Sequence, residues 1–208
     1  MSDNFADVLA EYRTRASDEA QRMAALGPEA FARRDEFLLE VGEDTANLLQ
    51  ALVVGCQAVR IVELGTSYGY STLFLAAAAK RTGGTVTTFE LSAEKQAYAR
   101  ERIERAGLSD QVRWQCGDAV ELLTDLPSSV DFVLIDLWKD LYVPCFQQLR
   151  PKLAANAVIV ADNMLHPPMV REDAEAYRRA IRQDGAFHSV LLPIGSGIEL
   201  SCLWGEGD

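Results

Sequence analysis

The sequence predicts an α/β fold: a mostly parallel β-sheet with helices on both faces, preceded by extra N-terminal helices. The first reason is that strand-like and helix-like segments alternate five times along the chain, which is typical of a parallel sheet with crossover helices. The second is a closing pair of strand-like segments joined by Pro193 and two glycines, a hairpin that adds one antiparallel strand. The third is size, because 208 residues without an internal repeat or low-complexity linker predict a single domain, residues 1–208.

Residues 1–57 are expected to form a helical N-terminal cap. Apolar residues recur there at three- and four-residue spacing, which is typical of amphipathic helices, and Pro28 suits a first helical turn. We expect this cap to cover the carboxyl ends of the strands as a lid; the alternative is that it only covers one face of the sheet. The predicted helices span residues 7–15, 28–40 and 43–54.

Residues 58–208 are expected to form the α/β core. Short β-branched runs bounded by glycine predict its strands, and Ser92 can cap one of its helices with Glu94 in the first turn. The predicted strands span residues 59–64, 85–91, 111–116, 130–136, 158–161, 187–192 and 198–204. The predicted helices span residues 71–80, 92–105, 119–126, 142–153 and 171–183.

Composition argues against several classes of partner and location. The 20 Lys and Arg against 31 Asp and Glu give a formal net charge of −11, which repels phosphate backbones, so no nucleic-acid partner is expected. The longest apolar run, residues 73–79, is far shorter than the ~20 residues of a membrane span. The acidic N-terminus, the four scattered cysteines and the two histidines favour a cytoplasmic protein without a disulfide framework or zinc site.

Ligands of such sheets bind at the carboxyl ends of the strands, so the residues that follow each strand are the candidates. After the first strand of the core, Gly65 and Gly69 allow a tight turn, and Ser71 lies at a helix N-terminus that would bind a carboxylate group. The loop lacks the dinucleotide-binding fingerprint. A plain strand-to-helix turn is the alternative.

The same loop, Gly65-Thr66-Ser67-Tyr68-Gly69, also has the pattern of a hydrolase nucleophile elbow. Asp162 and His188 follow it in the order that a catalytic triad requires. However, only helices precede the loop, and the sequence contains no His-Gly-Gly-Gly oxyanion loop. A Ser67-based α/β hydrolase is therefore the weaker alternative.

The next two strand ends favour a nucleoside ligand. Glu90 follows the second strand and is placed to accept hydrogen bonds from both hydroxyls of a ribose. Gly117-Asp118-Ala119 follows the third strand and offers a close backbone approach with a short carboxylate. Glu63 adds negative charge, which disfavours a phosphate and favours a cationic cofactor.

The fourth and fifth strands each end in an aspartate. If these strands are neighbours, Asp136 and Asp162 lie roughly 4.8 Å apart, and each raises the pKa of the other. A hard divalent cation would remove this repulsion, and Asn163 supplies a third oxygen ligand. The alternative is that one aspartate caps a helix and the other belongs to a turn. Lys139 is expected on the same side as Asp136, where a bound cation would make its amine easier to deprotonate.

At these residues the chain resembles the class I S-adenosylmethionine-dependent, cation-dependent O-methyltransferases, which include the catechol and caffeoyl-CoA enzymes. The resemblance covers about residues 36–204 and depends most on Asp136-Leu137-Trp138-Lys139-Asp140-Leu141-Tyr142 with Asp162-Asn163. It implies a Rossmann-like, seven-stranded sheet in the order 3-2-1-4-5-7-6, with residues 58–208 as the cofactor-binding core. A homodimer is the usual state of the bacterial members.

The resemblance also implies a role for each candidate. Lys139 would be the general base, Glu90 would bind the ribose, and Trp138 would lie near the adenine or the mouth of the acceptor site. The metal ligands would be Asp136, Asp162 and Asn163. The residues implied to bind the cofactor are Val41, Glu63, Gly65, Thr66, Ser71, Glu90, Asp118, Ala119, Asp136 and Trp138.

We therefore expect an S-adenosylmethionine-dependent O-methyltransferase that acts on a small vicinal dihydroxy aromatic, with Mg²⁺ or another divalent cation such as Mn²⁺ or Ca²⁺. A non-catalytic adenosylmethionine- or nucleoside-binding module is the alternative from another class. Two departures bear on the acceptor. His166 stands where many members carry Trp, and no clear match exists for the glutamate that holds the second hydroxyl in the catechol enzyme, although Glu199 is nearby in sequence.

Overall fold

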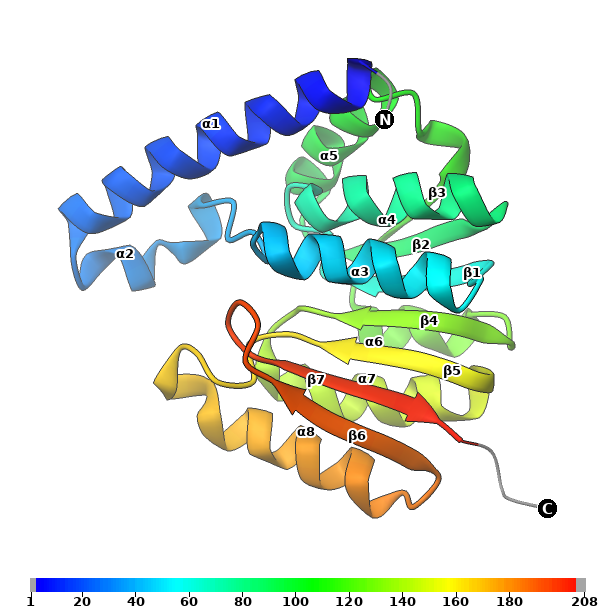
Figure 1. Cartoon of the computed structure of the whole chain (residues 1–208). Coiled ribbons are helices and arrows are strands. Elements are labelled where there is room, and N and C mark those ends of the chain that lie inside the picture. Colours follow the sequence, from blue (N-terminus) through cyan, green and yellow to red (C-terminus); the bar gives the residue numbers. More distant parts are fainter. Residues whose placement is uncertain (1–2, 205–208) are drawn as a thin grey trace.

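Seven strands form one sheet in the computed structural model, which describes residues 3–204 (Figure 1). The strands are β1 (Arg60–Leu64), β2 (Thr85–Glu90), β3 (Val112–Cys116), β4 (Val130–Ile135), β5 (Leu153–Ala161), β6 (Phe187–Leu192) and β7 (Ile198–Leu203). Their order is β3-β2-β1-β4-β5-β7-β6, and only β7 runs antiparallel to the strands β1 to β5. The predicted fold class and strand order are confirmed.

Helices cover both faces of this sheet (Figure 1). The helices are α1 (Asp3–Leu26), α2 (Glu29–Ala32), α3 (Glu43–Gly55), α4 (Tyr70–Thr82), α5 (Ala93–Arg105), α6 (Ala119–Leu122), α7 (Tyr142–Leu149) and α8 (Arg171–Gln183). On β4, Phe132 and Leu134 pack toward α3 and α4, whereas Val133 and Ile135 pack toward α7 and α8. Because β4 is buried on both faces, its sequence is a continuous apolar run rather than an alternating one.

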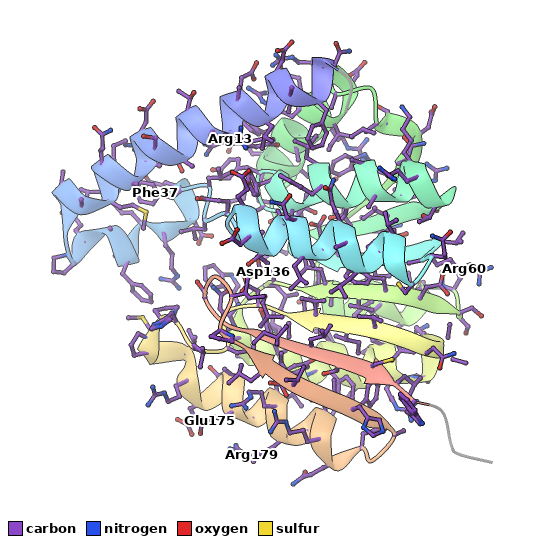
Figure 2. All side chains as sticks on the ribbon, viewed as in Figure 1. Arg13, Phe37, Arg60, Asp136, Glu175 and Arg179 are labelled. Atoms are coloured by element: carbon purple, nitrogen blue, oxygen red, sulfur yellow. The ribbon has the colours of Figure 1, made fainter. Side chains whose placement is uncertain are left out.

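The strand ends that carry the site are joined by backbone hydrogen bonds that continue the sheet. The Asp136 N–H donates to the Leu64 carbonyl at 2.8 Å, and the Asp162 N–H donates to the Ile135 carbonyl at 3.1 Å. The first residues after β4 and β5 are therefore held as rigidly as the strands themselves. In Figure 2, Asp136 lies at the opposite end of the sheet from Arg60, which begins β1.

The N-terminal prediction is only partly correct. Helix α1 has 24 residues, far more than predicted, and its buried residues Phe5, Leu9 and Tyr12 belong to one apolar cluster with residues of α4 and α5. The predicted helix over residues 28–40 is wrong: α2 has four residues, a single 3₁₀ turn follows, and Leu39 has a positive φ of 47°. The side chain of Glu19 on α1 accepts the Leu38 N–H at 2.5 Å, so a tertiary contact takes the place of a helical hydrogen bond.

A second difference lies between α7 and β5. The prediction continued the helix to residue 153, but α7 ends at Leu149 and β5 begins at Leu153. Pro151 explains the early end, because it lacks the backbone N–H that would donate to the Gln147 carbonyl, and a 3₁₀ turn over Arg150–Lys152 follows α7. In the part of the chain that the structure describes, no helix is both long and apolar enough to cross a membrane. The homodimer stays a prediction, since the structure is of one chain.

Candidate active site

Asp136 and Asp162 lie side by side at the carboxyl ends of β4 and β5. The two strands pair in parallel, and Ile135 is the register partner of Ala161, so the next residue of each strand is an aspartate. The condition on which the sequence argument depended, that these strands are neighbours, is met.

The two carboxyl groups disfavour each other's ionisation. Asp162 is only 2% exposed, and this burial together with the nearby Asp136 carboxylate raises its pKa to about 7. Burial also raises the pKa of Asp136, while Lys139, whose Nζ lies 3.6 Å from its Oδ1, opposes that rise. One lysine therefore faces a buried and a partly buried carboxyl group, which is an arrangement that favours a further positive charge.

The donor set fits a hard divalent cation. Within residues 3–204, no three His, Cys, Asp or Glu side chains form a cluster that could hold a metal ion. A metal at this edge would instead combine two carboxylates with a neutral oxygen, and Asn163, which has a left-handed φ of 56°, directly follows Asp162. Oxygen ligands of this kind, together with water, suit Mg²⁺ better than zinc.

Lys139 is held against the same site by a residue to which the sequence argument gave no role. Its side chain is 9% exposed, and its Nζ donates to the Tyr142 hydroxyl at 2.5 Å and to the Leu137 carbonyl at 3.0 Å. The fully buried Tyr142 in turn donates to the Ile135 carbonyl at 2.9 Å. Burial lowers the pKa of Lys139, against the opposing effect of the two aspartates. Tyr142 is the last residue of the motif over residues 136–142, and its place in that motif is the sequence feature that could have indicated a role in the site.

Gly65 allows the loop after β1 to pack directly on Asp136. Its φ is +102°, and a Cβ at this position would lie 2.0 Å from the Asp136 carbonyl oxygen. No other residue fits there without moving the backbone beside the aspartate pair. The glycine predicted for a tight turn is thus required by a close approach of two loops.

Glu63 lies beneath this loop rather than at its surface. The side chain is fully buried and accepts hydrogen bonds of 2.6 Å from the hydroxyls of Ser71, Thr72 and Thr88. Burial raises the pKa of Glu63 to about 7 in spite of these donors. The expectation that Glu63 supplies a free negative charge to a ligand is therefore corrected. It holds the loop, and Thr66, whose hydroxyl lies 2.5 Å from that of Thr88, belongs to the same network.

Ser71 can still face a ligand through its backbone. Its hydroxyl is bound to Glu63, but it lies in the first turn of α4, where the N–H groups have no partner within the helix. The residue at the N-cap is Gly69, and no side chain caps this end. A ligand carboxylate could therefore accept from these amides.

Glu90 and Asp118 occupy the ends of β2 and the loop after β3, as predicted. Glu90 Oε2 accepts the Ser67 N–H at 2.8 Å, and Oε1 accepts the Ser92 N–H at 2.9 Å, so this carboxylate already orders the loop after β1. Asp118 caps α6 by accepting the Val120 N–H at 2.8 Å. Ala119 follows it and is buried.

We expect Glu90→Ala to weaken binding of the nucleoside part of a cofactor. Loss of a charged hydrogen bond costs ~1.5–3 kcal/mol, or roughly 10- to 150-fold in dissociation constant. Glu90→Gln is the matched control, because it keeps one acceptor for the Ser67 N–H and should lose less. Calorimetric titration measures both, and an unchanged dissociation constant in Glu90→Ala would mean that Glu90 only orders the loop.

The N-terminal segment reaches the site from the other side. The Tyr12 hydroxyl donates to the Tyr68 carbonyl at 2.6 Å, and the Ser67 hydroxyl donates to the Leu38 carbonyl at 3.4 Å. Trp138 is 43% exposed, and the guanidinium carbon of Arg34 lies 4.6 Å from its ring centroid. Val41, which is buried, lies in the irregular segment that connects these contacts to α3.

The structure also bears on Glu199 as a ligand of the acceptor and on the Ser67 hydrolase. Glu199 is fully buried on β7 and forms ion pairs with Arg178 at 2.9 Å and Arg182 at 2.7 Å, so it is not free to bind an acceptor hydroxyl. The Ser67 hydrolase is not supported, because His188 lies on β6, which β4, β5 and β7 separate from β1.

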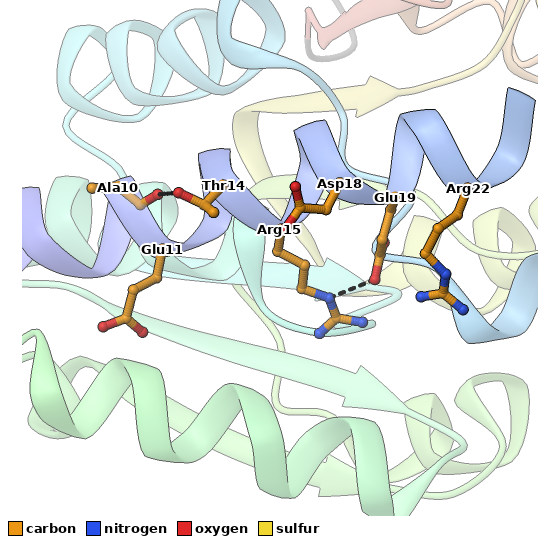
Figure 3. A pocket seen from close by; sticks show the side chains of 7 residues that line it. All are labelled: Ala10, Glu11, Thr14, Arg15, Asp18, Glu19 and Arg22. Carbon is orange, nitrogen blue, oxygen red and sulfur yellow. Dashed lines mark hydrogen bonds and ion pairs between the residues drawn. The ribbon is translucent and has the colours of Figure 1, made fainter.

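A hollow of about 630 Å³ lies along α1, away from this site (Figure 3). It is lined by α1 residues, among them Arg15, whose Nε lies 2.7 Å from Glu19 Oε1. None of the predicted site residues lines it. The strand-end residues therefore lie outside this hollow.

Comparisons with known proteins bear on the family to which the chain belongs. A family model described as O-methyltransferase matches residues 13–203. The chain is 34% identical over 157 residues to a catechol O-methyltransferase of Niastella koreensis, which covers 74% of this chain and 70% of that protein. It is 28% identical over 193 residues to caffeoyl-CoA O-methyltransferase 1 of Zea mays, and the match covers 83% of this chain and 74% of that protein.

A solved structure is similar over nearly the whole chain. The O-methyltransferase from Bacillus cereus, in complex with SAH, has a TM-score of 0.73 and 25% identity, covering 98% of this chain and 91% of that one. The chain also matches two vertebrate catechol O-methyltransferases over part of their length: 54% of catechol O-methyltransferase B of Danio rerio and 57% of the Bos taurus enzyme.

Proposed function

Since the chain belongs to the O-methyltransferase family of the catechol and caffeoyl-CoA type, we propose that it methylates one hydroxyl of a small vicinal dihydroxy aromatic with the help of a divalent metal. The observation that carries the proposal is the adjacent pair of the buried Asp162 and the partly buried Asp136, with Lys139 beside it. Two adjacent carboxyl groups and a buried amine suit a metal-assisted proton removal from a phenol.

The loops after β1, β2 and β3 would bind S-adenosylmethionine, whose sulfonium supplies the methyl group. Glu90 would accept from the ribose hydroxyls, and the free amides at the start of α4 would bind the carboxylate of the methionine part. Asp118 and Ala119 would border the adenine. Glu63 acts through Ser71 and Thr72, which it holds in place.

Asp136, Asp162 and Asn163 would hold Mg²⁺, Mn²⁺ or Ca²⁺, which as a Lewis acid lowers the pKa of a bound hydroxyl. Lys139 takes the phenolic proton, because its burial favours the neutral amine and Tyr142 positions its Nζ. Trp138 lies between Asp136 and Lys139 in the chain and offers an exposed flat surface for the aromatic ring. These residues bind, orient and deprotonate the acceptor, and the reaction otherwise depends on placing two reactants in line.

Radiolabelled methyl transfer to a panel of catechols, with and without EDTA, tests this function. We expect transfer to a catechol that is lost on chelation and restored by Mg²⁺. Transfer that survives full chelation would remove the metal from the proposal. Tight binding of the cofactor without transfer to any acceptor would favour the non-catalytic binding module.

We also propose that part of the N-terminal cap acts as a lid. Residues 29–40 contact two parts of the molecule beside the site. Arg34 lies over the Trp138 ring. Asp35 accepts hydrogen bonds from the Tyr68 hydroxyl and from Lys95. Hydrogen exchange should show that residues 29–40 gain protection when cofactor, Mg²⁺ and a catechol are all present.

The buried first half of α1 is the internal control for this experiment. Residues 5–12 pack on α4 and α5, so their exchange should be slow with or without ligands. If residues 3–40 exchange slowly and identically in both states, the whole segment is scaffold and the lid is wrong.

A further inference from the structure

Arg34 is held over the exposed ring of Trp138, at the mouth of the proposed acceptor site. Its guanidinium carbon lies 4.6 Å from the Trp138 ring centroid and 4.4 Å from that of Phe31. One nitrogen, Nη1, donates to the Phe31 carbonyl at 2.9 Å. Phe31 is 45% exposed and Trp138 43%, so the guanidinium lies between two rings that both face solvent.

Among the described residues, Arg34 has no ion-pair partner, whereas both its neighbours do. Arg33 pairs with Glu36 at 2.7 Å, and Asp35 pairs with Lys95 at 3.1 Å. Within residues 3–204, no carboxylate lies within ion-pair distance of Arg34.

The free donors of Arg34 suit a planar anion. A guanidinium offers five N–H groups in a rigid fork, and only one nitrogen is bound to a carbonyl here. Arg can stack on an aromatic ring and at the same time bind a carboxylate in bidentate fashion. The carboxylates on either side, Asp35 and Glu36, are already neutralised by Lys95 and Arg33, so they would repel an incoming anion only weakly.

We propose that Arg34 determines acceptor specificity by binding a carboxylate of the acceptor, so that the preferred acceptors are vicinal dihydroxy aromatic acids. The proposal rests on the proposed function. If the two hydroxyls face Asp136, Asp162 and Lys139 and the ring lies against Trp138, a substituent on the opposite side of the ring points away from the metal end. Arg34 is the cation above the Trp138 ring.

The test compares two acceptors that differ only in charge, 3,4-dihydroxybenzoate and 3,4-dihydroxybenzamide. In Arg34→Gln, the KM for the acid should rise about 10- to 100-fold, the range expected for a hydrogen bond to a charged group, while the KM for the amide changes less than about twofold. Arg34→Lys, which keeps the charge, should restore part of the loss. Arg33→Gln is the matched control, since Arg33 is paired with Glu36 and should affect neither acceptor.

Calorimetry supplies a readout without turnover. With S-adenosylhomocysteine and Mg²⁺ present, the wild-type protein should bind the acid more tightly than Arg34→Gln does. The two proteins should bind the amide with equal affinity. Equal weakening for acid and amide would overturn the proposal, because Arg34 would then only hold Trp138 in place. An unchanged KM for the acid would overturn it as well. Methylation of neither acceptor by wild-type protein, nor of plain catechol, would refute the proposed function and this inference with it.

Discussion

Asp162→Asn is expected to abolish methyl transfer almost completely while leaving cofactor binding intact. Asp162 follows β5 and lies on the side of Asp136 away from β1 and the glycine loop, so it should contact the metal alone. Loss of a residue that merely supports a metal ligand costs about 10- to 100-fold, and loss of a ligand should exceed that. Asn is the preferred replacement, because the Asp162 carboxylate accepts the Asn163 N–H at 2.6 Å and an amide oxygen can keep that bond.

Asp136→Asn is the comparison variant, because Asp136 is proposed to contact both the metal and the cofactor. Gly65 packs on the Asp136 backbone, so Asp136 lies between the aspartate pair and the cofactor loop and is proposed to serve both metal and cofactor. Calorimetry should therefore show weaker cofactor binding in Asp136→Asn and not in Asp162→Asn. Equal loss of cofactor affinity in both variants would contradict this division of roles.

Lys139→Met is expected to lower the rate by about 10²- to 10⁴-fold with a catechol whose hydroxyl is protonated at the assay pH, the usual range for loss of a general base. Methionine keeps a similar length without the amine. The loss should be much smaller with 4-nitrocatechol, whose nitro group makes the phenol far more acidic, because that acceptor needs little help in losing its proton.

The control for Lys139 is its hydrogen-bond partner. Tyr142→Phe removes the hydroxyl that lies 2.5 Å from Nζ but leaves the amine, so its rate should fall less than that of Lys139→Met. Because burial lowers the pKa of Lys139, the rising limb of the wild-type rate against pH should lie below the ordinary range of lysine and be absent in Lys139→Met. If Lys139→Met loses the same factor in rate with catechol and with 4-nitrocatechol, Lys139 is not the general base and only positions the acceptor.

Local patterns explain how much of the site was predictable. Each β-branched run ended at the residue where the structure ends a strand or within a residue or two of it, so Glu90, Asp136 and Asp162 were correctly placed at the carboxyl edge of the sheet. Their roles in cofactor and metal binding stay predictions. Local patterns did not show that Asp136 and Asp162 are neighbours: the family resemblance implied it, and the pairing of β4 with β5 confirms it.

Local patterns failed where distant residues compete with the helix. Phe31, Phe37, Leu38 and Val41 have helical spacing, yet residues 37–42 form neither a helix nor a strand. Phe37 and Leu38 are buried, and the Leu38 N–H is bound by Glu19 from another helix. Burial of apolar side chains and one strong tertiary hydrogen bond outweigh the weak helix propensity of a short segment.

Short-range sequence patterns were enough to predict the alternation of strands and helices, the glycine loop, and which acidic and basic side chains follow each strand. Those features depend on neighbours a few residues apart, where spacing and backbone preference act directly. Only the tertiary structure decided that Glu63 is buried under three hydroxyls from α4 and β2, and that Arg34 lies over Trp138 without a carboxylate partner among the described residues. Hydrogen bonds, burial and charge depend on which distant segments meet, and that is set by the packing of the whole sheet and its helices.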